Sequence, residues 1–516
     1  MKLKIHIEKE ISMNNKKALV SLGLTFLLLC SGCASESANL EGIDIVYTQT
    51  EQAAQTIHTE DTAAQIDNAA ATGNITTDFA KETESGGTAT AATVSAVESA
   101  TVPMTTASTA KHTTSAANKP KATAAAAATA AATAAVTTTT TTPKEAPAPL
   151  KYSDDMTTVQ VVKNMGLGIN LGNTFEPSVK WDENDNWIEK YLNANNYETA
   201  WGSPIITKQI IEGYAKCGFG ALRIPVAWSN FMSEDYTINN DLMNRIKQVT
   251  QWTVNSGMYA IVNIHWDGGW WEKFPDDKAN CMKKYTRVWE QICEGFKDFD
   301  GRVVFESLNE EGGSWESLWN RYTNEGDKEA SYKLLNEINQ KFVDIVRGSS
   351  YDNNKNRHLL IAGFCTDIDQ TCDKLYKMPN DPKSRCAISV HYYTPATFAL
   401  IDKDEPWGKV RATWGTEEDM RELVNNMQKM KERFVDKGVP VIIGEYSVCA
   451  KKLRERDSVH LYITSVIREA TKWGMCPVLW DVPHGEENIA NGYYDRTVCQ
   501  FLDRELLQKM KDAYVK

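Results

Sequence analysis

Residues 303–310 read Val303-Val304-Phe305-Glu306-Ser307-Leu308-Asn309-Glu310, an apolar run that ends in an amide and a carboxylate. A short apolar run of this kind predicts a buried β-strand, and the periodic pattern at 332–347 predicts an amphipathic helix after it. The same order recurs at 441–445, where Val-Ile-Ile-Gly leads to Glu445 and a helical pattern follows at 458–473. Repeated strand–helix units predict an α/β fold with parallel strands.

Outward from these two units, the chain after residue 150 contains eight candidate strands. They are 165–170, 221–226, 259–265, 303–309, 358–364, 387–391, 441–445 and 477–480. Helical patterns lie between most of them, at 207–217, 241–255, 285–299, 332–347, 417–437 and 458–473, and 503–514 closes the chain. The link between the fifth and sixth strands is short and weakly periodic.

Eight such units in residues 151–516 predict a (β/α)8 TIM barrel, formed by one domain with elaborated loops. The alternative is a doubly wound open sheet, which would need a glycine-rich phosphate turn after the first strand. Gly166 and Gly168 lie inside that expected strand instead. The barrel is therefore the favoured fold.

Residues 1–33 have the features of a signal peptide. Lys16 and Lys17 precede an apolar run at 18–29, which is too short to span a membrane and ends in small residues. The segment before Cys33 resembles a bacterial lipobox, with Cys30 in the position where Leu is usual. We therefore expect an extracellular protein, either secreted after cleavage or lipid-anchored at Cys33 to the outer face of a bacterial membrane.

Residues 34–150 are rich in Ala, Thr and Pro and contain few aromatic residues, which predicts a disordered linker. The formal net charge of −12 disfavours nucleic acid as a partner. The nine cysteines after Cys33 form no CxxC pair, so the sequence indicates neither a zinc cage nor a redox motif. A disulfide, for example between Cys365 and Cys372, stays open. We expect a monomer with no cofactor and no bound metal.

Polar or aromatic side chains stand at or just after the ends of seven of the eight expected strands. In chain order they are Asn173, Arg223, His265, Asn309 with Glu310, His391 with Tyr393, Glu445, and Trp480 with Asp481. The carboxyl ends of the strands meet at one face of a barrel, where the active sites of this fold lie. The sequence therefore predicts a functional site at this face.

Glu310 and Glu445 are the candidate catalytic pair, because each follows an apolar run in which an unpaired carboxylate would be costly. Strands four and seven lie across a barrel from each other, so the two groups can flank a bound sugar. Glycoside hydrolysis needs one carboxylic acid and one carboxylate. We expect Arg223 to keep Glu445 ionised, and apolar neighbours with the Glu445 charge to keep Glu310 protonated. Two salt-bridged structural residues are the alternative.

Several neighbours have expected supporting roles. Tyr393 is expected to donate a hydrogen bond to Glu445, Asn309 to reach the sugar 2-hydroxyl, and His265 and His391 to orient these groups or contact the sugar. Eight of the fifteen tryptophans fall in loops or at strand ends, namely Trp181, Trp187, Trp201, Trp228, Trp266, Trp270, Trp271 and Trp480. Flat indole faces stack on pyranose rings, so an exposed row of them predicts a glycan cleft. Trp480 is the first candidate, followed by Trp266 and Trp270; core packing is the alternative for each.

The order of these motifs resembles the family 5 glycoside hydrolases, most closely the bacterial subfamily 4 endoglucanases and xyloglucanases. The matching segments are GINLGNT at 168–174, ETAWG at 198–202, LRIPV at 222–226, VNIH at 262–265, ESLNE at 306–310, HYY at 391–393, GEY at 444–446 and LWD at 479–481. The resemblance covers the chain from about residue 154 to its end. Two positions depart from the family pattern, namely Glu311, where Pro is usual, and Trp266, where many relatives have a second His.

The resemblance implies a retaining mechanism in which Glu310 is the acid/base and Glu445 is the nucleophile. It also implies supporting roles for Arg223, His265, Asn309, His391, Tyr393 and Trp480. We therefore expect a secreted retaining endo-β-1,4-glucanase that hydrolyses β-glucan-type plant cell-wall polysaccharides, such as cellulose, mixed-linkage glucan and xyloglucan.

Other functions remain as alternatives. Loops rather than the catalytic pair decide the sugar, so a β-mannanase or a xylanase on the same scaffold stays open, as does a non-catalytic glycan-binding barrel. A metal-dependent barrel hydrolase would want an HxH on the first strand, which reads Gly-Ile-Asn, and a serine hydrolase would want a GxSxG elbow, which residues 151–516 lack. No carbohydrate-binding module is visible in the sequence, so we expect crystalline cellulose to be a poor substrate.

Overall fold

The structure is a computed structural model of the 516-residue chain. It describes residues 152–177, 194–310, 325–483 and 492–515. The predicted signal peptide (1–33) and linker (34–150) lie outside these residues, as do Trp181, Trp187 and Glu311. Within the described ranges, no helix combines the length and the apolar character needed to cross a membrane.

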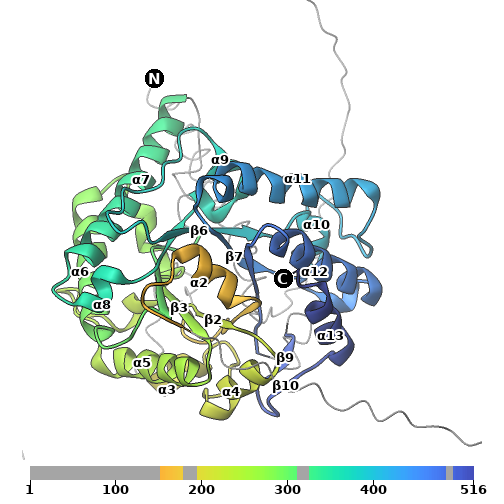
Figure 1. The fold of residues 1–516 in the computed structure, drawn as a ribbon, viewed down its shortest axis with the longest axis horizontal. Coiled ribbons are helices and arrows are strands. Elements are labelled where there is room, and N and C mark those ends of the chain that lie inside the picture. The colour runs from red at the N-terminus through yellow and green to blue at the C-terminus, as the bar shows by residue number, and fades with distance from the viewer. Residues whose placement is uncertain (1–151, 178–193, 311–324, 484–491, 516) are drawn as a thin grey trace, which may run out of the picture. The chain divides into compact units, whose positions relative to one another are not determined.

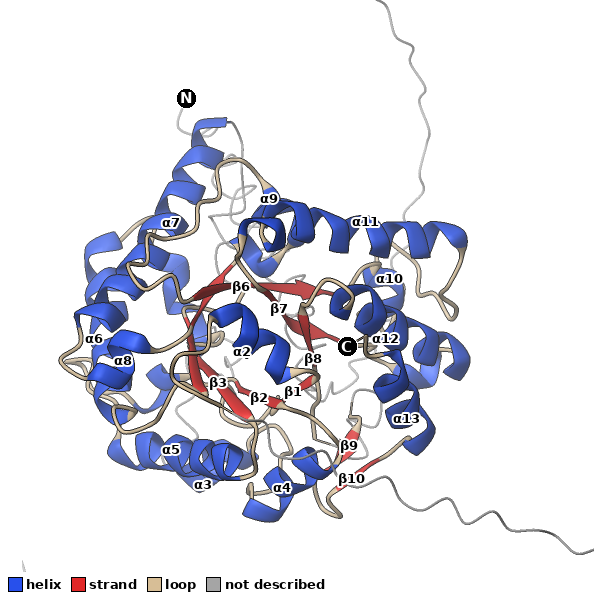
Figure 2. Ribbon diagram, viewed as in Figure 1, coloured by secondary structure: helices blue, strands red, loops and turns tan. Residues whose placement is uncertain are grey.

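Eight parallel strands form a closed barrel, which confirms the predicted fold. In chain order they are β1 (Gly168–Asn170), β2 (Ala221–Ile224), β3 (Tyr259–Asn263), β4 (Val303–Glu306), β5 (Leu359–Ala362), β6 (Cys386–Tyr392), β7 (Val441–Tyr446) and β8 (Cys476–Leu479). The ring closes where Gly168 and Ile169 of β1 pair with Val478 and Leu479 of β8. This closure excludes the open sheet, and Figure 2 shows the strands enclosed by helices.

The helices surround the barrel (Figure 1). They are α3 (Ala194–Thr199), α4 (Lys208–Lys216), α5 (Asn240–Asn255), α6 (Lys278–Gly295), α7 (Glu325–Gly348), α8 (Asp352–Asn356), α9 (Ile368–Cys372), α10 (Ala396–Ala399), α11 (Glu417–Arg433), α12 (Arg456–Thr471) and α13 (Arg504–Ala513). A small antiparallel pair, β9 (Tyr494–Asp495) and β10 (Gln500–Phe501), precedes α13. Only the short α9 and one 3-10 turn lie between β5 and β6, in agreement with the weak periodicity of that link.

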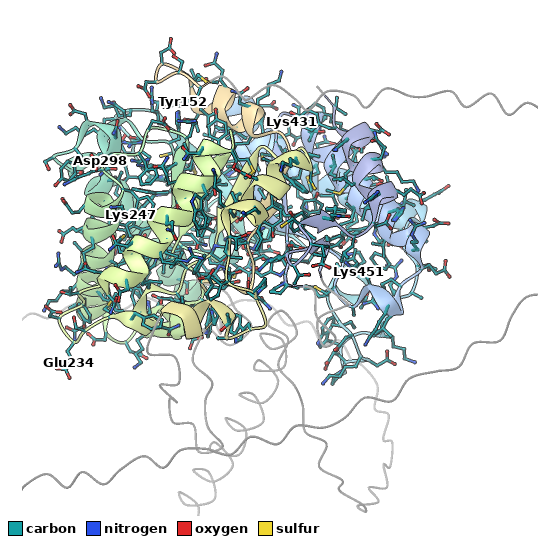
Figure 3. All side chains as sticks on the ribbon, turned by 90° about the horizontal axis from the view of Figure 1, so that it is seen from below. Tyr152, Glu234, Lys247, Asp298, Lys431 and Lys451 are labelled. Carbon is teal, nitrogen blue, oxygen red and sulfur yellow. The ribbon has the colours of Figure 1, made fainter. Side chains whose placement is uncertain are left out.

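A further helix, α2 (Thr158–Met165), closes the amino-terminal end of the barrel (Figure 1). The sequence pattern placed Met165 in the first strand, whereas the structure ends this helix there. Thr157 and Gln160 form a capping box that begins the helix, and its Val161 and Val162 pack on the inward side chains of the strands. In Figure 3, Tyr152 lies at this end of the molecule and Glu234 at the opposite end.

Alternate residues of each strand point into the barrel, and their side chains form stacked layers inside it. One of these layers is apolar and the next is polar. The layer nearest α2 is apolar and consists of Ala221, Ile261, Val304, Leu360, Ala387, Ile442, Cys476 and Val478. Two positions further along their strands, Arg223, Glu306 and Ser389 are also buried, but they are polar. The site at the carboxyl ends of the strands therefore rests on a buried polar layer.

The nine cysteines between residues 217 and 499 are all free thiols. The bridge between Cys365 and Cys372 that the sequence left open is not formed, and Cys372 Sγ instead lies 3.6 Å from Met430 Sδ. Hydrophobic packing and hydrogen bonds therefore hold the described part of the barrel together without disulfides.

Candidate active site

Arg223 organises the carboxyl-terminal face of the barrel from β2. Its Nε donates to Glu306 at 2.7 Å, its Nη1 to Glu445 at 2.7 Å and its Nη2 to Asn309 at 2.7 Å. The side chain is completely buried, and an unpaired cation there would be costly. The planar guanidinium thus fixes the direction of three acceptors that come from β4, the loop after it and β7.

A second tier of hydrogen bonds supports this arginine. Nη1 also donates to Asn170 Oδ1 at 3.1 Å, and Asn170 Nδ2 donates to the Gly444 carbonyl at 2.9 Å. Ser389 Oγ donates to Glu306 Oε1 at 2.8 Å. The sequence patterns predicted no role for Glu306, Asn170 or Ser389. Strand alternation was the available signal, since Glu306 follows the inward Val304 by two residues and therefore points at the same interior as Arg223.

Glu445 lies at the end of β7 with only 7% of its side chain exposed. A β-bulge between β6 and β7 places it beside His391 in the register of the two strands. Tyr393 Oη donates to Glu445 Oε2 at 3.0 Å, the contact that the sequence predicted. Burial raises the pKa of Glu445, and the Arg223 guanidinium opposes that rise by stabilising the carboxylate in a direct ion pair.

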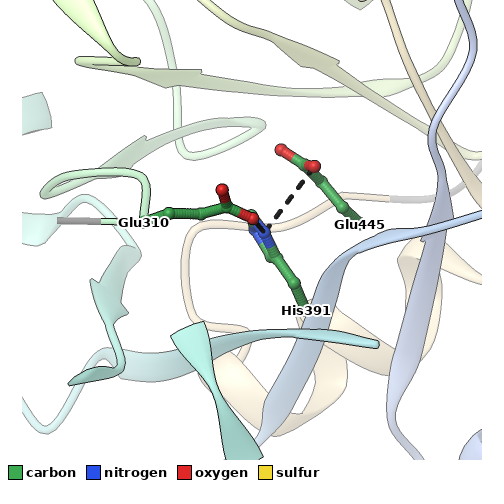
Figure 4. Close-up of side chains that lie close together, drawn as sticks. All are labelled: Glu310, His391 and Glu445. Atoms are coloured by element: carbon green, nitrogen blue, oxygen red, sulfur yellow. Dashed lines mark hydrogen bonds and ion pairs between the residues drawn. The ribbon is translucent and has the colours of Figure 1, made fainter. Parts of the chain in front are cut away.

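Glu310 follows β4 and faces Glu445 across the mouth of the barrel (Figure 4). Its side chain is 47% exposed, yet the surrounding protein displaces enough water to raise its pKa to about 7, an effect that the Arg223 charge opposes. Glu310 Oε1 lies 2.7 Å from His391 Nδ1. The two carboxyl groups therefore differ in environment, since one is paired with a cation and the other holds a proton up to near-neutral pH.

His391 lies between the two carboxyl groups, with 4% of its side chain exposed. Its Nδ1 is 2.7 Å from an oxygen of Glu310 and 3.6 Å from an oxygen of Glu445. Burial lowers the pKa of His391 to about 4, so the ring is neutral at neutral pH. One proton then serves the bond to Glu310, carried either by the carboxyl group or by Nδ1.

One carboxylate oxygen of Glu310, one of Glu445 and a ring nitrogen of His391 all lie within 4.8 Å of one another. Within the described part of the chain, they are the one group of three or more His, Cys, Asp and Glu side chains close enough to share a metal ion. The strand ends predicted these three residues at one face, but the sequence shows no metal-ligand spacing among them, because they come from three different strands.

His265 and Trp480 stand beside this centre. Their rings stack with centroids 5.8 Å apart and planes within 7° of parallel. Burial, with the Arg223 charge, lowers the pKa of His265 well below its ordinary value, so it is neutral. Trp480 is only 4% exposed. In this structure the indole is covered and stacks on His265, and its role as a sugar platform stays a prediction.

Besides Trp480, two members of the expected row of exposed tryptophans are buried, so the prediction of exposure is wrong for these residues. Trp228 and Trp271 are completely buried core residues, and their indole N–H groups donate to the backbone carbonyls of Asn263 and Trp266. Alternation and loop position cannot separate a surface indole from one that packs under a loop. Trp201, Trp266 and Trp270 are partly buried, and Trp266 packs edge-on against Trp271.

Asn173 and Asp481 follow the first and the eighth strand, and the supporting role of Asn173 stays a prediction. Asn173 has a left-handed φ of 54°, its backbone N–H donates to Glu176, and its buried amide has no partner among the described residues. Asp481 accepts from the backbone N–H groups of Tyr493 and Tyr494 at 2.7 and 3.0 Å. Asp481 thus anchors the chain that returns after β8, and neither residue bonds to the catalytic pair.

Residues 181–484 match the family model described as cellulase, glycosyl hydrolase family 5. Endoglucanase A of Paenibacillus barcinonensis is 33% identical over 355 residues, which cover 63% of this chain and 82% of that protein. A broad-specificity endoglucanase described as GH5-4, from an uncultured bovine rumen ciliate, is similar in structure, with a TM-score of 0.61 and 33% sequence identity. The match covers 69% of this chain and 98% of that one. A family 5 lichenase from Caldicellulosiruptor sp. F32, solved as a mutant with cellotetraose, has a TM-score of 0.63 and 28% sequence identity, and the match covers 72% of this chain and 99% of that one.

Proposed function

Because this chain belongs to the cellulase family, glycosyl hydrolase family 5, we propose that it is a retaining endo-β-1,4-glucanase acting on β-glucan-type polysaccharides. The distance between its two carboxyl groups carries the proposal, since their nearest oxygens lie within 4.8 Å. Retaining glycosidases hold the two groups about 5–5.5 Å apart, whereas inverting enzymes need about 6.5–9.5 Å to admit a water molecule. The separation in this site favours direct attack by a carboxylate.

In the first step, Glu445 Oε2 or Oε1 attacks the anomeric carbon while the glycosidic bond breaks. Glu310 gives its proton to the leaving oxygen, and the sugar becomes an ester of Glu445. In the second step, Glu310, now ionised, takes a proton from water, and the water oxygen displaces Glu445. Two inversions restore the β configuration, and both carboxyl groups return to their starting states.

The neighbours of the pair each have a physical part in this scheme. Arg223 and Tyr393 hold Glu445 by hydrogen bonds of 2.7 and 3.0 Å, which orient the attacking oxygen. Asn309 Oδ1 is occupied by Arg223, so its Nδ2 is the end available to donate to a sugar hydroxyl. His391 shares the proton of Glu310 and so fixes the direction of the acid.

The relatives favour β-glucans over xylan and mannan as substrates. The ciliate relative is described as a broad-specificity endoglucanase, and the Caldicellulosiruptor lichenase was solved with a glucose tetrasaccharide. We extend this preference to the present chain. Faster hydrolysis of β-mannan or xylan than of β-glucans would contradict it. The export signal expected in residues 1–33 supports action outside the cell, either free or at the membrane surface.

The test is hydrolysis of lichenan, carboxymethylcellulose, xyloglucan, xylan and mannan by the full chain. We expect activity on one or more β-glucans, and a loss of at least about three orders of magnitude in Glu445→Gln. Glu337→Gln is the matched control, because Glu337 lies on α7 and pairs only with Lys278 among the described residues. NMR of the first product from a soluble β-glucan should show the β anomer.

Two outcomes would contradict the proposal. An α anomer as first product would mean that the carboxyl groups admit water and that the mechanism inverts. Binding of the glucans without hydrolysis would make the chain a glycan-binding barrel, and the roles given to Glu310 and Glu445 would then be wrong.

A further inference from the structure

The three side chains at the centre of the site have the composition of a transition-metal site. Two carboxylate oxygens and one imidazole nitrogen suit Zn²⁺ and similar divalent ions, whereas Ca²⁺ and Mg²⁺ prefer six or more oxygen ligands. The imidazole is the decisive member, because it is held by burial with Nδ1 directed between the two carboxyl groups (Figure 4). The group therefore differs from a surface cluster of acids.

The distances between these atoms are close to those around a bound ion. Zinc binds nitrogen and carboxylate oxygen at about 2.0–2.2 Å, which puts the ligand atoms of a tetrahedral site about 3.4 Å apart. His391 Nδ1 and Glu445 Oε2 are already 3.6 Å apart, and His391 Nδ1 and Glu310 Oε1 are 2.7 Å apart. Every pair in the group lies within 4.8 Å. Shifts of about an ångström or less bring most of these separations to the zinc value.

The half-exposed Glu310 is the side chain that can make such a shift. Burial holds His391, and burial with the bonds of Arg223 and Tyr393 holds Glu445, whereas 47% of the Glu310 side chain faces solvent. The same opening gives an ion a path to the site and leaves its fourth position for water.

We propose that Glu310, His391 and Glu445 form an inhibitory site for Zn²⁺ or a similar divalent transition-metal ion. The inference rests on the proposed function, since the ion would occupy the acid and the nucleophile together. A bound ion withdraws the lone pair that Glu445 needs for attack and prevents Glu310 from carrying a proton. It also fills the space between them, so it competes with the sugar, and the enzyme stays inactive while the ion is bound.

Binding is measured first, by isothermal titration of the metal-free full chain with Zn²⁺. We expect one site, with affinity lowered at least about tenfold in both Glu310→Ala and Glu445→Gln, since even the loss of an outer partner of a metal ligand costs that much. His460→Gln is the matched control, because His460 also pairs with a carboxylate, Asp503, at 2.9 Å but lies away from the catalytic pair. Mg²⁺ in place of Zn²⁺ should give no binding at this site.

Inhibition is measured second, on lichenan, which is uncharged and does not itself bind the ion. Zn²⁺ should raise the apparent KM with kcat unchanged, and EDTA should restore the rate. Zinc affinity that is equal in wild type, Glu310→Ala and Glu445→Gln overturns the inference, as does inhibition that more substrate does not relieve. A chain that binds zinc at these residues but hydrolyses no glucan would contradict the proposed function and leave the metal site standing.

Discussion

The hydrogen-bonded pair of Glu310 and His391 explains how one carboxyl group can stay protonated beside another that is ionised. Burial keeps the His391 ring neutral, so the pair holds a single proton within a bond of 2.7 Å. Displaced water raises the pKa of Glu310 to about 7, while Glu445 faces the Arg223 cation. The difference in charge between the two groups thus follows from their different neighbours.

The pH dependence of hydrolysis should report this proton. The first chemical step needs Glu310 in its acid form, so kcat/KM on a β-glucan should fall as pH rises through about 7. Glu310→Ala should lose about 10²–10⁴-fold on the polysaccharide. It should lose much less in the first step with a dinitrophenyl β-cellobioside, whose leaving group needs no proton. A stopped-flow burst of dinitrophenolate measures that step, and an alkaline limb that persists in Glu310→Ala would assign it to another group.

The site depends on the geometry of the Arg223 guanidinium and not on its positive charge alone. Lysine keeps the positive charge but cannot bond to Glu306, Glu445 and Asn309 in three fixed directions. We expect Arg223→Lys to lower kcat by about 10²-fold, as displacement of a catalytic group does. Arg302→Lys is the control, because Arg302 pairs with Asp300 near the surface. Steady-state kinetics with an unfolding curve for each variant separates an effect on catalysis from an effect on stability. A kcat of Arg223→Lys within twofold of wild type would mean that the fixed directions of these bonds do not matter for catalysis.

At the scale of elements, the sequence predicts which strand residues alternate toward the barrel interior. It does not predict where a β-bulge breaks that alternation. Short apolar runs that end in polar residues identified the eight strands and the face of the site. The bulge between β6 and β7, which turns Glu445 beside His391, depends on pairing between distant segments. The same limit explains α2, whose Met165 continues an apolar pattern that suits a strand equally well, and the buried Trp228 and Trp271.

The contact between the ends of β1 and β8 should be sensitive to a single methyl group. A Cβ at Gly172 would lie 2.6 Å from the Asp481 carbonyl and 2.9 Å from the Trp480 ring. We expect Gly172→Ala to lower stability by about 1–3 kcal/mol and to raise KM, because the end of β8 must move with Trp480 and the stacked His265. Gly348→Ala, at the exposed end of α7 with no atom near its Cβ, should be neutral or stabilising. Urea unfolding and lichenan kinetics make the comparison, and equal effects of the two variants would count against it.

At the scale of the whole molecule, buried and paired ionisable groups should make the barrel sensitive to acid. Burial holds the pKa of His358 at about 3 and that of His391 at about 4, so both rings are neutral in the folded state. Burial alone would raise the pKa of Asp381, but the Arg347 guanidinium and backbone N–H groups lower it to about 2. In each case the folded state binds fewer protons than the unfolded chain as pH falls, so stability decreases toward acid pH.

Asp381 gives the most direct test of this pH dependence, because it accepts two hydrogen bonds from Arg347, at 2.7 and 3.0 Å, in a nearly buried ion pair. Its folded pKa of about 2 lies below the unfolded value of about 3.9, so its contribution is complete above pH 5 and is lost as pH falls toward 2. We expect Asp381→Asn to cost about 2–3 kcal/mol at pH 7 and progressively less below pH 4. Asp352→Asn, at an 89% exposed position, is the control and should follow wild type throughout. Urea unfolding from pH 7 to pH 3 measures the free energy of unfolding of each protein. A difference between wild type and Asp381→Asn that stays constant with pH would mean that the ion pair does not link folding to proton binding.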